Sequence, residues 1–128
     1  MKQILKSFDN FLDFKLINEI ESYVDASLKS EEPKWKTSFQ WKQSIQRSTP
    51  PVPILLLPDK FTIPIHKTLK EKAGLTWKES TPPQPSQYYL YPPGGYIGWH
   101  DDVIYEFASI IFLNPVWNLD WGGIFLYE

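Results

Sequence analysis

The residues of this chain with the clearest capacity for chemistry are His100 and Asp102. In an extended strand, residues two positions apart point to the same face, so one imidazole and one carboxylate would project together. These groups are two of the three ligands in the facial triad that holds non-haem Fe(II). The spacing therefore predicts a metal site, although a His-x-Asp pair can equally be a surface pair or a pair that shares a hydrogen bond.

The surroundings of this pair favour the metal site. Residues 96–99 are mostly apolar and lead directly into His100, and a Pro-Pro-Gly-Gly turn at 92–95 precedes them. Two polar groups buried at the end of an apolar strand are costly unless something coordinates or hydrogen-bonds them. A bound Fe(II) would supply that coordination.

The charge of the chain is unevenly distributed. All 13 Lys and Arg residues lie at or before Lys78, and against nine acids they give residues 1–78 a formal charge of +4. Residues 79–128 contain six acids and no base. The net charge of -2 does not favour a nucleic-acid partner. Without a cysteine, a disulfide framework is excluded.

The elements that must position the pair include two helices. Apolar residues recur with a helical period over 11–28, where Asp9 or Asn10 is the expected N-cap. A second helix is expected over 65–73, entered through Pro64 and closed by Gly74.

The remaining segments have strand character. Residues 34–45 alternate, and 54–57 form a short buried run followed by a turn at Pro58-Asp59. Four further strands are expected at 87–91, 96–102, 108–113 and 123–127, with turns at 92–95, at Asn114-Pro115 and around 120–123. The pattern predicts an α+β chain. Its N-terminal part is basic and more helical, and its C-terminal part is acidic, aromatic and rich in strands.

A longer series of residues surrounds the His-x-Asp pair. Tyr91 and Gly94 precede it, and residues 109–114, Trp117 and Gly122-Gly123 follow it. In order and spacing this series resembles the 2-oxoglutarate/Fe(II)-dependent oxygenases, and more narrowly their prolyl-4-hydroxylase-like branch. The resemblance covers residues 87–128 well and residues 8–28 loosely.

The resemblance implies a single domain over 1–128 in which N-terminal helices pack on a partial double-stranded β-helix, or jelly roll. Residues 1–86 would be the helical and mixed support region, and 87–128 the first half of the jelly-roll core. His100 and Asp102 would hold Fe(II), and Tyr91 would line the 2-oxoglutarate pocket. Residues 110–113 would form a pocket wall that ends at Asn114. No catalytic residue beyond the metal ligands is expected.

The family pattern continues with a second histidine and then a basic residue that binds 2-oxoglutarate. No histidine follows His100, and no base follows Lys78. Before the His-x-Asp pair, His66 is expected to be an ordinary helix residue and Arg47 a surface residue. We therefore expect a C-terminally truncated core, short of a full jelly roll by roughly 60 residues, and no activity from this chain alone.

Other interpretations remain open. The aromatic residues could make this a non-catalytic jelly-roll module that binds a sugar or peptide, or copies of the chain could share one site. The apolar run 124–127 predicts a homo-oligomer joined through an unpaired strand edge. A small-molecule or peptide substrate is expected, with no membrane partner. Because no signal peptide and no long apolar run is present, we expect a cytoplasmic protein.

Overall fold

The computed structural model describes residues 5–32, 34–37, 52–97, 105–118 and 120. Two helices and a small three-stranded antiparallel sheet make up the described elements, so the α+β class is confirmed. The chain divides into two compact units. Unit 1 comprises Met1–Glu32 and Leu56–Tyr88, and unit 2 comprises Pro33–Leu55 and Tyr89–Glu128.

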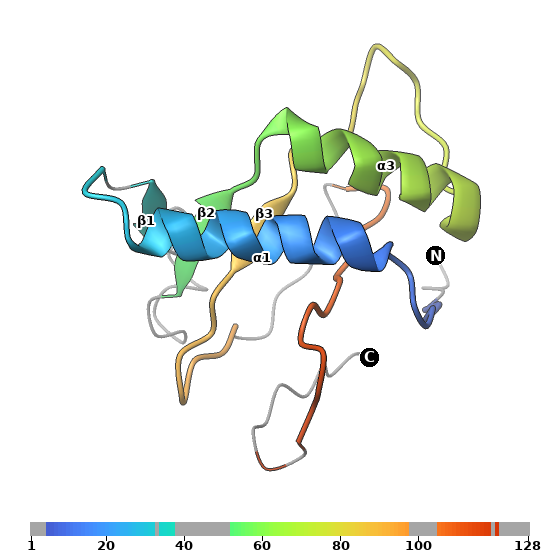
Figure 1. Ribbon diagram of the computed structural model, residues 1–128. Helices are drawn as coiled ribbons and strands as arrows, with labels where there is room; N and C mark the ends of the chain where they lie inside the picture. Colours follow the sequence, from blue (N-terminus) through green and yellow to red (C-terminus); the bar gives the residue numbers. More distant parts are fainter. Residues whose placement is uncertain (1–4, 33, 38–51, 98–104, 119, 121–128) are drawn as a thin grey trace. The chain divides into compact units, whose positions relative to one another are not determined.

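The first helix of unit 1 is α1, Phe14–Leu28 (Figure 1). It begins three residues later than the apolar period indicated, and its N-cap is Asp13, whose Oδ1 accepts the Lys15 N–H at 2.7 Å. The expected caps Asp9 and Asn10 are therefore wrong. Asn10 has a left-handed φ of 50°, so the chain turns there before the helix starts.

The apolar stripe of α1 is confirmed in its central turns. Ile20 and Val24, spaced by one helical turn, are buried. Ser27 continues the same face, where its hydroxyl donates to the Tyr23 carbonyl at 2.8 Å and thus satisfies a buried polar group. Leu28, expected in the stripe, is exposed at the end of the helix.

The second helix of unit 1 is α3, Asp59–Ala73. It starts six residues before the expected position, since Pro58 is its N-cap and Asp59 its first residue rather than parts of a turn. Pro64, expected at the entrance, lies inside the helix. The predicted end is confirmed: Gly74 adopts φ 67° and its N–H donates to the Leu69 carbonyl.

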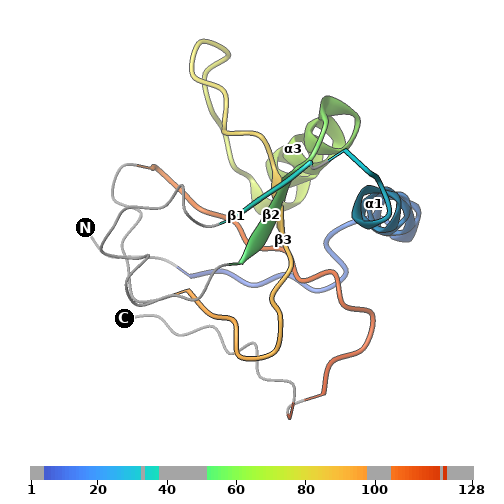
Figure 2. The same ribbon diagram turned by 90° about the vertical axis from the view of Figure 1, so that its left-hand side faces the viewer.

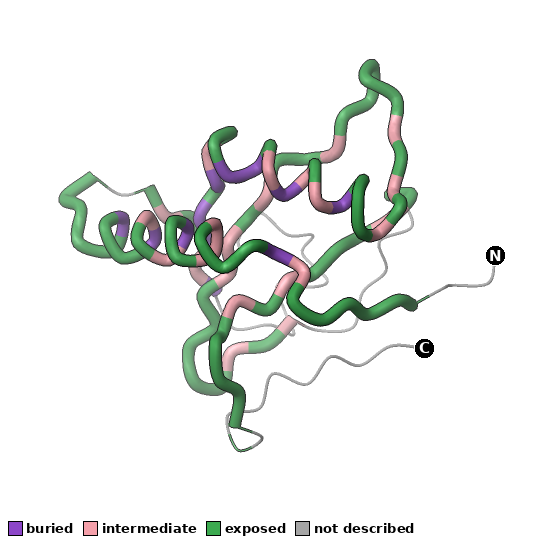
Figure 3. Tube along the Cα trace, turned by 45° about the vertical axis from the view of Figure 1, so that its right-hand side comes forward, coloured by how far each residue is buried: buried purple, intermediate pink, exposed green. Residues whose placement is uncertain are grey.

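Helices α1 and α3 run alongside each other in unit 1 (Figures 1 and 2). Phe61, Ile65 and Leu69 recur every four residues on α3 and are buried. The buried stretches of the two helices appear as purple segments in Figure 3. The Tyr23 and Phe61 rings meet edge to face, with centroids 5.3 Å apart. The core of unit 1 thus lies between two amphipathic helices.

The sheet has the order β1-β2-β3, with bounds β1 Trp35–Thr37, β2 Pro53–Leu56 and β3 Gln87–Tyr89. In the antiparallel register of β1 with β2, Trp35 lies opposite Leu55 and Thr37 opposite Pro53. Pro53 is the first residue of β2, where its missing N–H is tolerated, and its carbonyl accepts the Leu90 N–H at 3.0 Å.

The expected strands are confirmed only in part. The strand over 34–45 is present as β1, with 38–45 outside the described residues. The buried run 54–57 is confirmed in part: β2 begins at Pro53 and ends at Leu56, which is exposed, whereas Ile54, Leu55 and Leu57 are buried. The strand over 87–91 is present as β3, which ends at Tyr89. Residues 108–113 are described but make no strand pairing, so that prediction is wrong for this structure. The expected strand 123–127 lies outside the described residues.

Among the described helices, neither is long and apolar enough to cross a membrane.

Candidate metal and co-substrate site

The two predicted iron ligands, His100 and Asp102, lie outside the described residues. Their predicted role is therefore neither supported nor contradicted by geometry. Within the described ranges, no group of three or more His, Asp or Glu side chains is placed to hold a metal ion. The metal ligands that the sequence predicts are the imidazole and carboxylate of the His-x-Asp pair, whose chemistry suits Fe(II).

The other histidine, His66, is a helix residue, as expected. It lies on α3, where its ring meets the Trp77 indole edge to face at 5.6 Å. Burial lowers the pKa of His66, a hydrogen bond to the Gln84 backbone opposes this, and the nearby Lys70 charge lowers it further. Since Lys70 Nζ also lies 4.3 Å from the Trp77 ring centre, the indole packs against two side chains one turn apart on α3. Arg47, expected on the surface, lies outside the described residues.

Tyr91, the predicted co-substrate residue, follows directly after β3 in unit 2. Its ring stacks on Tyr89, with centroids 6.2 Å apart and planes 16° from parallel. The two rings share a side because residues two apart in an extended chain point the same way. Tyr91 stays 47% exposed. Burial, with a smaller contribution from Tyr89, raises the pKa of Tyr91 to about 12. The phenol is protonated at physiological pH, as an unshifted tyrosine would be, and can donate a hydrogen bond.

The predicted turn after Tyr91 is confirmed at residues 93–94. The Gly95 N–H donates to the Pro92 carbonyl at 2.8 Å, and Gly94 takes a left-handed φ of 77°. A Cβ at Gly95 would lie 2.9 Å from the Pro92 carbonyl oxygen, which leaves no room for a side chain. Both glycines are thus required by the turn that leads the chain from Tyr91 towards the His-x-Asp pair.

The predicted pocket wall, residues 110–113, forms no strand in the described structure. Ile110 and Phe112 are each 60% exposed, whereas Ile111 and Leu113 are partly covered, so exposure alternates. A bend at 115–116 confirms the predicted turn, and it brings the Phe112 and Trp117 rings edge to face at 6.2 Å.

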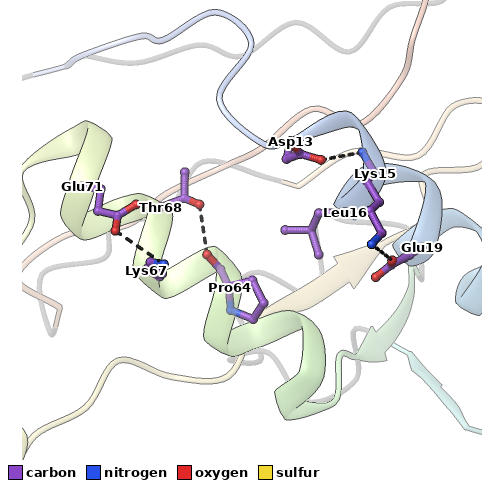
Figure 4. Close-up of a pocket in the computed structure, with 8 residues that line it drawn as sticks. All are labelled: Asp13, Lys15, Leu16, Glu19, Pro64, Lys67, Thr68 and Glu71. Atoms are coloured by element: carbon purple, nitrogen blue, oxygen red, sulfur yellow. Dashed lines mark hydrogen bonds and ion pairs between the residues drawn. The ribbon is translucent and has the colours of Figure 1, made fainter.

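A cavity of about 350 Å³ lies within unit 1 between α1 and α3 (Figure 4). Four of its five charged side chains are paired: Lys15 with Glu19 at 3.9 Å, and Lys67 with Glu71 at 3.8 Å. The fifth, Asp13, accepts the Lys15 backbone N–H as the N-cap of α1. The Thr68 hydroxyl, also in the lining, donates to the Pro64 carbonyl at 3.0 Å. The polar groups of this cavity are therefore engaged within the two helices.

A neighbouring cavity of about 640 Å³ shares Lys15 and Glu19 with the first and is lined by residues of α1 and of the first turn of α3. Phe14, Tyr23 and Phe61 supply aromatic surface to it, and Lys60 supplies a cation. Sequence reasoning missed this site because Pro58-Asp59 was assigned to a turn. That assignment left Lys60 and Phe61 outside any helix, although the acid at 59 was a first-turn signal.

The comparisons with known proteins found no relative. No family model matches the chain, and searches of curated proteins and of solved structures returned no match.

Proposed function

We propose that this chain carries two of the three iron ligands of a 2-oxoglutarate/Fe(II)-dependent hydroxylase acting on a peptide or small molecule. The observation that carries the proposal is the ordered series of Tyr91, Gly94, His100 and Asp102, with the apolar and glycine segments that follow. The turn at 92–95 supports it, because both of its glycines are sterically required directly before the ligand pair.

In this proposal residues 87–128 form the first half of a jelly roll. The antiparallel pairing of β2 with β3 and the alternating exposure of residues 110–113 are compatible with such a sheet. Bound Fe(II) supplies a Lewis-acidic centre for 2-oxoglutarate and dioxygen. The His100 imidazole and the Asp102 carboxylate hold the ion, and the neutral Tyr91 hydroxyl donates a hydrogen bond to a co-substrate carboxylate.

The chain does not supply every group this chemistry requires. A third protein ligand would have to be a histidine after His100, and the anchor for the distal 2-oxoglutarate carboxylate a base after Lys78; the sequence has neither. We therefore expect weak metal binding by the 128-residue chain and no measurable decarboxylation of 2-oxoglutarate. Sustained turnover would show that other residues fill these roles.

The chain contains only two histidines, which allows a matched test of the metal site. Mn(II), a redox-stable substitute for Fe(II), should broaden the imidazole NMR signals of His100, its proposed ligand, at lower Mn(II) concentrations than those of His66. His100→Ala and Asp102→Asn should each weaken Mn(II) binding by at least about tenfold, since each removes one of two protein ligands. His66→Ala should leave it unchanged. Equal effects of the two histidine substitutions would contradict the proposal.

A second candidate is a non-catalytic module that binds a sugar or peptide on its aromatic residues. The exposure of Tyr91, Tyr96 and Trp117, each between 43% and 52%, favours it. In that case Mn(II) would broaden neither histidine, and removal of Tyr96 or Trp117 would abolish ligand binding while His100→Ala left it intact.

A further inference from the structure

The larger cavity of unit 1, which we name the aromatic groove, lies between α1 and the first turn of α3. It is lined by Phe14, Asn18, Ser22, Tyr23, Lys60 and Phe61, together with the Lys15–Glu19 pair. Phe61 is buried and meets Tyr23 edge to face, so two of the rings form a fixed floor. Phe14 is 72% exposed, which leaves a third ring available at the rim.

The cation of the groove differs from the neighbouring lysines in its partners. Lys60 Nζ lies 4.8 Å from the Phe61 ring centre and 5.2 Å from the Tyr23 ring centre. Within the described part of the chain, no carboxylate lies at ion-pair distance from it. Lys15 and Lys67, by contrast, each have a glutamate one turn further along the helix.

We propose that the aromatic groove binds a small aryl carboxylate, with the ring of the ligand on Phe14 and Tyr23, the buried Phe61 ring supporting Tyr23, and its carboxylate on the Lys60 ammonium.

The physical basis is complementarity of both parts of such a ligand. Phe14 and the half-buried Tyr23 offer apolar surface to an aromatic group, and the volume of about 640 Å³ exceeds what a single ring with a short acid requires. The Lys15–Glu19 pair is neutral overall, so Lys60 gives the lining a net positive charge. The Asn18 amide and the Ser22 hydroxyl supply hydrogen-bond donors beside it.

The site is independent of the proposed metal centre, because none of its residues belongs to the His-x-Asp segment. A negative result in the Mn(II) experiment would leave the aryl carboxylate site untouched. A negative result in the phenylacetate titration would likewise leave the proposed metal site untouched.

The test is a titration of the full chain with phenylacetate, followed by the backbone amide NMR shifts of residues 14–23 and 60–61. We expect saturable shifts confined to these segments, with a dissociation constant of about 1 mM. Phenylacetamide has the same ring without the charge and should bind about tenfold more weakly. Acetate, which has the charge without the ring, should produce no saturable shift.

Two substitutions separate the contributions of charge and ring. Lys60→Gln should weaken phenylacetate binding about tenfold without affecting phenylacetamide, whereas Lys60→Arg should retain it. Phe14→Ala should weaken both aryl probes by a similar factor, and because Phe14 is exposed the fold should be kept. Lys67→Gln, a matched loss of a paired lysine on the same helix, should change nothing.

The inference would be overturned by the absence of saturable shifts at tens of millimolar phenylacetate. Equal affinity for the acid and its amide would also overturn it, as would an unchanged affinity after Lys60→Gln.

Discussion

At the scale of single residues, the pKa values of two tyrosines are raised by different surroundings. Tyr88 lies on β3 in unit 1, where its hydroxyl donates to Glu21 Oε1 at 3.4 Å. The pKa of Tyr88 is raised to about 12, first of all by burial. The charge and hydrogen bond of Glu21 contribute next, and the charge of Asp25 contributes least. Tyr91, in unit 2, reaches about the same pKa through burial, with little help from neighbouring charge.

This difference predicts separable titrations. Glu21→Gln should move the pKa of Tyr88 down towards its ordinary value of 10.0, because the carboxylate disfavours tyrosinate, and should leave Tyr91 unchanged. Tyrosinate absorbance between pH 9 and roughly 12.5, compared with Tyr88→Phe and Tyr91→Phe, would measure both. A shift of Tyr91 in the Glu21→Gln variant would contradict the assignment.

The same pKa values determine how stability depends on pH. Since the folded-state pKa of Tyr88 exceeds the unfolded value, the folded state favours the protonated hydroxyl. The stabilisation is fully present below pH 10 and is lost as the pH rises through the folded value of about 12. Chemical unfolding across this range should therefore show less alkaline destabilisation in Tyr88→Phe than in the native chain.

At the scale of elements, Thr62 connects α3 with the ends of two strands. Its hydroxyl donates to the Leu57 carbonyl at 3.3 Å and accepts the Ser86 N–H at 3.2 Å. Leu57 N–H in turn donates to the Ser86 carbonyl at 2.9 Å. One buried side chain thus joins the residue after β2 to the residue before β3 within unit 1.

Loss of this bridge should destabilise the chain more than its position on a helix suggests. Thr62→Val keeps the side-chain volume but leaves a buried carbonyl and a partly buried N–H without their partner, at a cost of about 1–3 kcal/mol. Thr68→Val removes only a bond to the Pro64 carbonyl on the same helix and should cost less than about 0.5 kcal/mol. Urea unfolding of both variants measures the loss in the free energy of unfolding. Equal losses would show that the Thr62 bridge stabilises the fold no more than the Thr68 bond within the helix.

A second contact between elements lies just before the start of α1. Lys72 Nζ, near the end of α3, donates to the carbonyls of Phe11 at 2.7 Å and Asn10 at 3.3 Å. These bonds connect the end of α3 to the turn before α1, whose N-cap is the local bond of Asp13 with the Lys15 N–H.

At the scale of the whole molecule, apolar side chains on the surface are concentrated in the described part of residues 105–118. Ile110, Phe112 and Val116 are 60–68% exposed, and Trp117 is 43% exposed. Soluble monomers rarely carry such surface without a partner. Together with the apolar run 124–127, this exposure supports the proposal that copies of the chain associate.

Association should be visible as a mass above 15.0 kDa in light scattering. Phe112→Ser combined with Val116→Ser should shift the chain towards the monomer, since both remove exposed apolar surface. Phe14→Ser is the control, because Phe14 is also highly exposed but belongs to unit 1. This substitution should leave the mass of the chain in solution unchanged. A monodisperse monomer of the native chain at high concentration would exclude the proposed homo-oligomer.

The sequence alone predicted those features that depend on neighbours along the chain. The apolar period of α1, the left-handed Gly74 that ends α3, and the glycine turn at 94–95 follow from local backbone and side-chain preferences. The Thr62 bridge, the contact of Lys72 with the turn at Asn10 and the unpaired state of residues 108–113 were decided by the tertiary structure. The first two join residues far apart in the sequence, Thr62 with Ser86 and Lys72 with Asn10, which no local pattern encodes.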